Sequence, residues 1–154
     1  MKWLWLTGLV VVLDQVTKYF AEQNLSYCAP VKVIPGFFSM TLVYNKGAAF
    51  NFLSDAGGWQ RWFLILVVIA ICLFLLAWLR TIEKNRIHLA VGIALVLGGA
   101  IGNLIDRSIY GHVIDFIEIY YRDWHWPHFN IADSAISIGA GLLIYDIFKY
   151  SHDN

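Results

Sequence analysis

Residues Trp62 to Leu79 read WFLILVVIAICLFLLAWL, a run without a single charged side chain. A helix that crosses a bilayer needs about 20 mainly apolar residues, with a range near 17–25, so this run predicts a transmembrane helix. Of the 154 residues in the chain, 59% are hydrophobic and only 14% are charged, and the mean hydropathy is +0.61. Soluble domains carry about 25% charged residues. The composition therefore indicates an integral membrane protein.

Three other segments are long and apolar enough to cross a membrane, although the first is interrupted by Asp14, Gln15 and Lys18. We therefore expect an all-α membrane protein with four transmembrane helices, at about residues 3–20, 62–79, 87–105 and 131–148. The sequence shows no internal repeat and no low-complexity segment. We expect residues 1–154 to form a single domain.

The short connection between the second and third spans, RTIEKNR at residues 80–86, is rich in Lys and Arg. Basic residues concentrate in cytoplasmic loops of membrane proteins, so we expect this loop and both termini to be cytoplasmic. The connections at about 21–61 and 106–130 then face outward. The first of them contains two β-prone runs, Val31–Ile34 and Met40–Tyr44, on either side of Pro35-Gly36. This pattern predicts a small extracytoplasmic β-sheet-like loop.

Two aspartates, Asp115 and Asp133, lie in uncharged stretches at the predicted outer face. An ionised carboxylate near hydrocarbon costs roughly 2.5–3.5 kcal/mol at a helix centre and less near an interface. Two neighbouring carboxylates can share one proton, which is the chemistry of aspartic proteases. Two simpler interpretations stay open. Asp133 could cap the last helix, and Asp115 could be a loop carboxylate paired with Arg107 or Arg122.

Several polar residues near the outer end of the third span could support such a site. Asn103 and Arg107 are four residues apart and share a helix face, and Arg107 could hold a carbonyl, a carboxylate or a lipid phosphate. Asp106 could fix Arg107 or cap this region. Asn130 could bind substrate backbone or cap the last helix.

The first span carries Asp14 and Lys18, also four residues apart, which could be a self-neutralising pair. In the third span, Gly98 and Gly102 have the spacing that lets helix backbones approach closely. Small residues in the last span, Ala135, Gly139 and Gly141, are similarly placed. We expect these residues to draw the third and fourth spans together, which would bring the two aspartates near each other.

The sequence offers little support for other chemistry. His112, His125 and His128 flank the aspartates, but no His-Glu-x-x-His motif is present, so we expect neither a metal nor a cofactor. Cys28 lies in a polar loop and Cys72 in an apolar run, so we expect no disulfide. The net charge of zero argues against a nucleic-acid partner.

Four sequence blocks together resemble bacterial lipoprotein signal peptidase, also called signal peptidase II. They are DQVTK at 14–18, NKGAAF at 45–50, GAIGNLIDR at 99–107 followed by GHVIDFI at 111–117, and FNIAD at 129–133. The blocks occur in the order and with the spacing of that family, without a departure at the motif positions. The resemblance spans essentially the whole chain.

The resemblance implies an aspartic intramembrane protease in which Asp115 and Asp133 form the catalytic pair. It gives substrate-positioning or structural places to Asp14, Lys18, Asn45, Gly47, Asn103, Arg107, Asn130 and Ala132. The family removes signal peptides from prolipoproteins, just before a cysteine that already carries diacylglycerol. It also implies extracytoplasmic strands and a mobile loop that covers the site, which fits the connection at 106–130.

The same resemblance implies a multi-pass protein of the bacterial cytoplasmic (inner) membrane with its active site at the outer face. The expected partners are diacylglyceryl-prolipoproteins, membrane phospholipid and an inhibitor of the globomycin type, with the enzyme acting as a monomer. Two other classes compete. A proton or solute transporter would suit Asp14 and Lys18 but should have charges at mid-bilayer. A structural or assembly subunit would not need the outer carboxylate pair.

Overall fold

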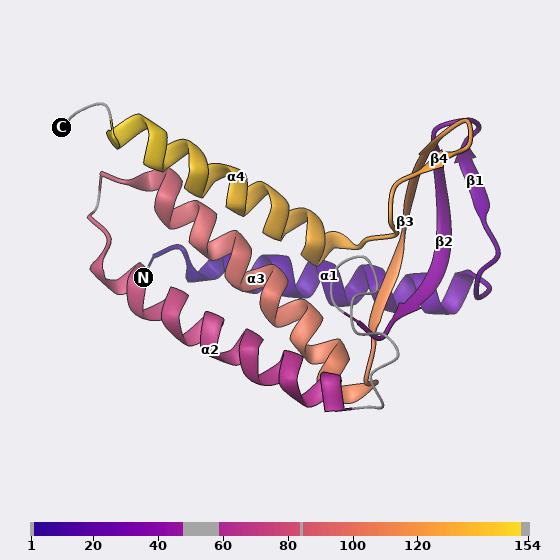
Figure 1. Cartoon of the computed structure of the whole chain (residues 1–154), viewed down its shortest axis with the longest axis horizontal. Helices are drawn as coiled ribbons and strands as arrows, with labels where there is room; N and C mark the ends of the chain where they lie inside the picture. Colours follow the sequence, from indigo (N-terminus) through magenta and orange to yellow (C-terminus); the bar gives the residue numbers. More distant parts are fainter. Residues whose placement is uncertain (1, 48–58, 84, 152–154) are drawn as a thin grey trace.

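The computed structural model describes residues 2–47, 59–83 and 85–151. Four helices long and apolar enough to cross a membrane lie alongside one another (Figure 1). They are α1 (Leu4–Asn24), α2 (Trp59–Thr81), α3 (Ile87–Ile109) and α4 (Ile131–Ser151). The four expected spans are therefore confirmed, and each helix continues past the end expected for it. The extra turns matter at the C-terminal end of α3, because they carry Asp106 and Arg107.

Helix α3 is the centre of the bundle. It packs against α1, α2 and α4, and a much larger share of it is buried than of the other three helices. Ile93, Ala94 and Leu97 are completely buried. The outer helices instead expose large apolar side chains, such as Trp62 and Leu66 on α2. An apolar exterior of this kind is typical of helices surrounded by lipid.

Glycines allow α4 to lie directly against α3. A Cβ atom at Gly99 would collide with the carbonyl oxygen of Ala132, and one at Gly139 would lie 2.7 Å from the carbonyl oxygen of Gly92. Such close backbone approach needs small residues at the contact. The expected pairing of the third and fourth spans is thus found, but it runs through Gly92, Gly99 and Gly139.

The other glycines singled out from the sequence have different neighbours. Gly98 faces Val10 of α1, and Gly102 faces Asp14 of α1. These two glycines therefore mainly admit α1. Nothing lies within 4 Å of a Cβ built on Gly141, so the expectation that Gly141 takes part in the helix contact is wrong.

A four-stranded antiparallel sheet lies at one end of the bundle (Figure 1). Its strands are β1 (Val31–Ile34), β2 (Phe38–Asn45), β3 (Val113–Tyr121) and β4 (Trp124–His125), in the order β1-β2-β3-β4. The two β-prone runs form β1 and β2 as expected. The connection at 106–130, in contrast, is not an open covering loop, because it contains β3, the longest strand of the sheet.

The pairing of β2 with β3 carries Asn45 to Asp115. Val43 lies opposite Asp115, and Asn45 lies opposite Val113. Diagonal neighbours across an antiparallel pair share a face, so the Asn45 and Asp115 side chains can meet. An irregularity in the register between Met40 and Val43 sets which residues of β2 face the bundle.

A polar contact joins α3 and α4 at the end of the bundle far from the sheet. Asp146 of α4 is completely buried and forms an ion pair with Arg86, the N-cap residue of α3. Removing one partner of a buried pair leaves an uncompensated charge. The bundle is therefore fastened by charge at this end and by small residues along its length.

We predict opposite effects for two glycine substitutions. Gly99→Ala should lower the free energy of unfolding by about 1–3 kcal/mol, because the added methyl group has no space beside Ala132. Gly141→Ala should be neutral or stabilising, because its position is open and Ala favours helix over Gly by about 1 kcal/mol. Thermal unfolding in detergent measures both. Equal midpoints for the two variants would contradict the close α3–α4 contact.

Candidate active site

Lys18 is a fully enclosed cation at the junction of α1 and α3. Its ammonium lies 2.8 Å from Asp14 and 2.7 Å from Asp106, and it donates a hydrogen bond of 3.0 Å to Asn103 Oδ1. Lys18 is 1% exposed, and both aspartates are fully buried. The self-neutralising pair of Asp14 and Lys18 is found, but Asp106 joins it. Of the two roles suggested for Asp106, fixing Arg107 or capping this region, the first is replaced by this ion pair.

Gln15 completes the same network, and the sequence reasoning assigned it no role. Its amide donates to Asp106 Oδ1 at 2.9 Å, to Asp14 Oδ2 at 3.2 Å and to the carbonyl of Gly102 at 3.2 Å. A carboxamide inside an apolar span, beside a charged residue, was the signal that could have identified it. Gln15 lets two buried carboxylates share one neutral donor.

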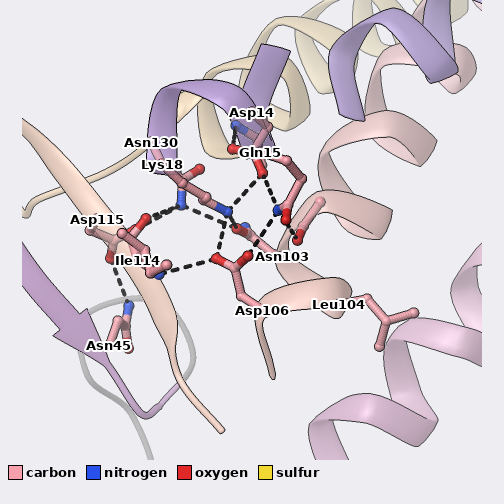
Figure 2. A network of polar contacts seen from close by, with 12 residues as sticks. Asp14, Gln15, Lys18, Asn45, Asn103, Leu104, Asp106, Ile114, Asp115 and Asn130 are labelled. Carbon is pink, nitrogen blue, oxygen red and sulfur yellow. Dashed lines mark hydrogen bonds and ion pairs between the residues drawn. The ribbon is translucent and has the colours of Figure 1, made fainter. Parts of the chain in front are cut away.

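The two carboxylates around Lys18 also fix the elements that carry Asp115 and Asp133 (Figure 2). Asp14 accepts a hydrogen bond of 2.9 Å from the backbone N–H of Ala132, which is fully buried in the first turn of α4. Asp106 accepts one of 3.1 Å from the N–H of Ile114, next to Asp115 in β3. The charge cluster therefore holds α1, α3, β3 and α4 together.

Asp133 lies in the first turn of α4 and forms a reciprocal cap with Asn130. The Asp133 N–H donates to Asn130 Oδ1 at 2.9 Å, and the Asn130 N–H donates to Asp133 Oδ2 at 3.2 Å. This is a capping-box arrangement, so the interpretation of Asp133 as a capping acid is correct. Oδ1 of Asp133 takes no part in this cap and accepts a hydrogen bond of 2.8 Å from Asn103 Nδ2.

Asp115 is 2% exposed and is held by two amides. Asn130 Nδ2 donates to it at 2.8 Å and Asn45 Nδ2 at 3.3 Å. Burial, reinforced by the charge of Asp133, raises the pKa of Asp115 to about 7, against its ordinary 3.8. The interpretation of Asp115 as the ion-pair partner of Arg107 or Arg122 is not supported by these contacts.

Asn103 and Asn130 connect the two aspartates. Asn130 Nδ2 donates to Asp115 and also, at 3.1 Å, to Asn103 Oδ1. Asn103 in turn donates to Asp133. A chain of amides therefore runs from one carboxylate to the other, with Lys18 attached to it through Asn103. The expected proximity of Asp115 and Asp133 is consistent with this chain and with the effect of Asp133 on the pKa of Asp115.

Arg107 extends from α3 towards the end of β2. Its Nη2 donates to the carbonyl of Gly47 at 2.9 Å, while its Nε is buried without a partner among the described residues. Gly47 is held by a hydrogen bond of 3.0 Å from its N–H to Asn45 Oδ1. Residues 48–50, which complete the second sequence block, lie outside the described part of the chain.

Arg61, on the first turn of α2, supports the end of α3 and was also missed from the sequence. Its Nε donates to the carbonyl of Arg107 at 2.8 Å, and its Nη2 donates to that of Ser108 at 2.7 Å. A cation that binds the last carbonyls of a helix satisfies acceptors that have no partner within the helix. The position of Arg61 just before an apolar span was the available signal.

A pocket of about 270 Å³ opens beside this network. It is lined by Asn45, Asn103, Arg107, Val113, Trp126, Pro127, His128, Phe129, Asp133, Ile136 and Ser137. A second hollow of about 330 Å³ continues from it along α4 and shares Trp126, Phe129, Asp133 and Ser137. Asp133 therefore faces both spaces. Together they form a polar site with an apolar extension.

The histidines near the site have separate neighbours. His112 lies against Tyr44, with 4.4 Å between ring centroids, whereas His125 and His128 lie next to Glu118. Within residues 2–47, 59–83 and 85–151, no three His, Cys, Asp or Glu side chains gather closely enough to hold a metal ion. Cys28 is exposed and Cys72 is buried, and both are free thiols.

Known proteins resemble this chain in sequence and in fold. The family model described as Signal peptidase (SPase) II matches residues 6–149. The chain belongs to the signal peptidase II family. A lipoprotein signal peptidase of Pseudomonas paraeruginosa (strain PA7) is 53% identical over 148 residues, which cover 96% of this chain and 88% of that protein. One from Pseudoalteromonas atlantica is 49% identical over 149 residues, covering 97% and 90%.

A bacterial membrane enzyme solved by the in meso method at 2.3 Å resolution superimposes with a TM-score of 0.90 at 33% identity, covering 99% of this chain and 91% of that one. Membership of the signal peptidase II family makes this protein a peptidase. The described parts of all four signal peptidase II blocks lie in or beside the network around Lys18, Asn103 and Asn130 (Figure 2).

We predict that charge balance around Lys18 controls the stability of this signal peptidase II protein. Lys18→Met should lower the free energy of unfolding by about 3–5 kcal/mol, because it leaves two buried carboxylates without a cation. A triple variant that adds Asp14→Asn and Asp106→Asn should recover much of this loss. Lys32→Met, on exposed β1, is the matched control and should be neutral.

Unfolding midpoints in detergent compare the stability of Lys18→Met, the triple variant and Lys32→Met. A triple variant no more stable than Lys18→Met alone would show that lost packing, and not uncompensated charge, accounts for the effect.

Proposed function

We propose that this protein is an aspartic endopeptidase that removes the signal peptide from diacylglyceryl-modified prolipoproteins, cutting just before the lipidated cysteine. Asp115 and Asp133 are the catalytic pair. The single observation that carries the proposal is the amide chain from Asp115 through Asn130 and Asn103 to Asp133, beside a pocket that Asp133 lines. Membership of the signal peptidase II family and the names of the relatives support the substrate class.

The reaction uses one carboxylate as base and the other as acid. Asp133 takes a proton from a water molecule, whose oxygen attacks the scissile carbonyl carbon, while Asp115 donates its proton to the carbonyl oxygen. The tetrahedral intermediate then collapses. The C–N bond breaks, the leaving nitrogen receives the proton held by Asp133, and Asp115 recovers its proton from the hydroxyl that becomes the new carboxyl C=O.

The surroundings of the two aspartates favour this division of roles. Asp133 accepts hydrogen bonds from Asn103 and from the Asn130 N–H and lies at the N-terminus of α4, where the helix dipole favours negative charge. Asp115 is more buried, and its pKa is raised to about 7 by burial and by the charge of Asp133. Asp115 is therefore the better proton donor near neutral pH.

The other site residues hold this pair and the substrate. Asn45 and Asn130 fix the Asp115 carboxyl, and Asn103 fixes that of Asp133. Asp14, Lys18, Asp106 and Ala132 form the buried support that joins α1, α3 and α4. Arg107 and Gly47 form one edge of the site, where Arg107 lines the pocket.

The site is placed to receive a lipid-anchored substrate. Residues 1–154 form a single domain in the bacterial inner membrane, with both termini cytoplasmic and the sheet and aspartates at the outer face. The diacylglyceryl group holds the scissile bond at this depth, so that binding energy from the lipid positions the reacting atoms. We further propose that the enzyme acts as a monomer among phospholipids and that globomycin-type inhibitors occupy the space beside the aspartates.

We predict that Asp115→Asn and Asp133→Asn each abolish cleavage of a diacylglyceryl-prolipoprotein while the protein stays folded, because each substitution removes one proton carrier. The loss should be at least about 10³-fold, in keeping with general acid–base catalysis. Asp123→Asn, in the exposed turn between β3 and β4, is the matched control and should cleave normally. A gel-shift assay in detergent measures all three, with unlipidated precursor as the control substrate.

Cleavage that survives either substitution in a folded protein would reject the catalytic pair. Equal cleavage of lipidated and unlipidated precursor would reject the proposed role of the diacylglyceryl group.

We predict a pH dependence that belongs to Asp115. Activity should fall as pH rises above about 7, because the proton donor ionises. Stability should fall as well, between about pH 4 and pH 7, since a carboxyl whose pKa is raised in the folded state favours folding only while it is protonated. Asp115→Asn should lack this slope in unfolding midpoints measured against pH. A wild-type midpoint that rises over this range, with the slope unchanged in the variant, would contradict the assignment.

A further inference from the structure

A row of polar side chains crosses the sheet on the face opposite to Asp115. Ser39 of β2 lies opposite Glu118 of β3, and the bridge between Ile117 and Phe129 brings His128 to the other side of Glu118. Asp115 and Glu118 are three residues apart on a strand, so their side chains point to opposite faces. None of this row takes part in the reaction proposed above.

Glu118 is the charged member of this row and is nearly enclosed. Its Oε2 accepts hydrogen bonds from Ser39 at 2.5 Å and from Thr41 at 2.7 Å, and its Oε1 lies 2.8 Å from His125 Nδ1. Burial alone raises the pKa of Glu118, but the hydrogen bonds from Ser39, Thr41 and His125 outweigh it and lower the pKa to about 2. Glu118 is therefore an anion throughout the neutral range.

The other end of the row belongs to the wall of the substrate pocket. Residues 126–129 line the pocket beside Asp133. Backbone hydrogen bonds join this wall to β3 at both of its ends. The Trp126 N–H donates to the carbonyl of Ile119 at 2.9 Å, and Phe129 and Ile117 exchange two hydrogen bonds of 2.9 and 3.1 Å. These hydrogen bonds lie on either side of Pro127 and His128. Pro127 itself has no N–H with which to make another one.

The side chain of His128 lies beside Glu118 in the middle of the wall. Its Nε2 lies 3.8 Å from Glu118 Oε1 and has no hydrogen-bond partner among the described residues. His125, at the end of the wall on β4, contacts the same oxygen. Both histidines that flank Trp126 and Pro127 thus lie beside one carboxylate, which contacts His125 directly and is itself fixed to β2 by two hydroxyl groups.

We infer that Glu118 is a positioning residue for substrate binding, which holds the pocket wall at residues 126–129 through His125 and His128. This inference rests on the proposed function, because it assigns the pocket to the lipidated precursor. The wall also precedes Asn130, but the cap between Asn130 and Asp133 fixes that residue independently. Loss of Glu118 should therefore weaken binding and leave the chemical step nearly intact.

The experiment compares Glu118→Gln with Glu83→Gln, a matched control in the exposed connection between α2 and α3. In Glu118→Gln, KM for the diacylglyceryl-prolipoprotein should rise about tenfold, in keeping with the loss of hydrogen bonds to a charged group, while kcat stays within about twofold. Glu83→Gln should change neither constant. Unfolding midpoints are measured alongside, since an equal midpoint separates altered positioning from general destabilisation.

A double-variant cycle tests the route through His128. If Glu118 acts through the wall, Glu118→Gln should have a much smaller effect on KM in a His128→Leu background than in the wild type. Strictly additive effects, an unchanged KM, or a fall in kcat alone would overturn the inference. Should Glu118→Gln fail to fold, His125→Ala, which removes one exposed contact of Glu118, must raise KM in the same direction.

The outcomes for the two proposals are distinct. Wild-type cleavage with an unchanged KM in Glu118→Gln overturns only the positioning role. Failure of the folded wild-type protein to cleave the lipidated precursor overturns the proposed function, and the positioning role falls with it.

Discussion

The contact between Lys18 and its two carboxylates is the constraint on which the rest of the structure depends. A lone charge buried in a membrane protein is costly, and this one is offset by Asp14 and Asp106 at 2.8 and 2.7 Å. These two carboxylates also accept hydrogen bonds from the N–H groups of Ala132 and Ile114. The same aspartates that balance the charge of Lys18 therefore fix the start of α4 and of β3. The cluster that satisfies the charges is therefore also the frame that carries the aspartates.

Neutral amides connect this frame to the carboxylates of Asp115 and Asp133. An asparagine can donate and accept at the same time, and Asn103 and Asn130 use both capacities to join Lys18, Asp115 and Asp133. A charged linker in the same place would shift the proton affinity of the aspartates. Amides transmit position without adding net charge, which leaves one carboxyl free to keep a proton.

Hydropathy predicted the four helices, and β-prone runs predicted the β1–β2 hairpin, because these features depend on local composition. The sequence blocks named residues that the structure gathers around Lys18, Asn103 and Asn130. Contacts between distant segments were less accessible. The sequence suggested that Asp106 fixes the adjacent Arg107 or caps this region, but only the packing of α1 on α3 shows that Asp106 pairs with Lys18. Likewise, residues 113–121 were expected to lie in a connection and not in a strand. The pairing of β3 with β2, and with it the contacts of Glu118, joins segments far apart in the sequence. Gln15 and Arg61 were missed for the same reason.

The cap shared by Asn130 and Asp133 has a consequence for the biogenesis of the enzyme. Asp133 belongs to α4, and Asn130 immediately precedes this helix. Until α4 enters the bilayer and packs on Gly99 of α3, Asp115 lacks one amide donor and Asp133 lacks Asn103. A nascent chain that lacks α4 thus carries Asp115 without Asp133 and without the Asn130–Asp133 cap. Under the proposed mechanism, cleavage therefore requires α4 to be packed on α3.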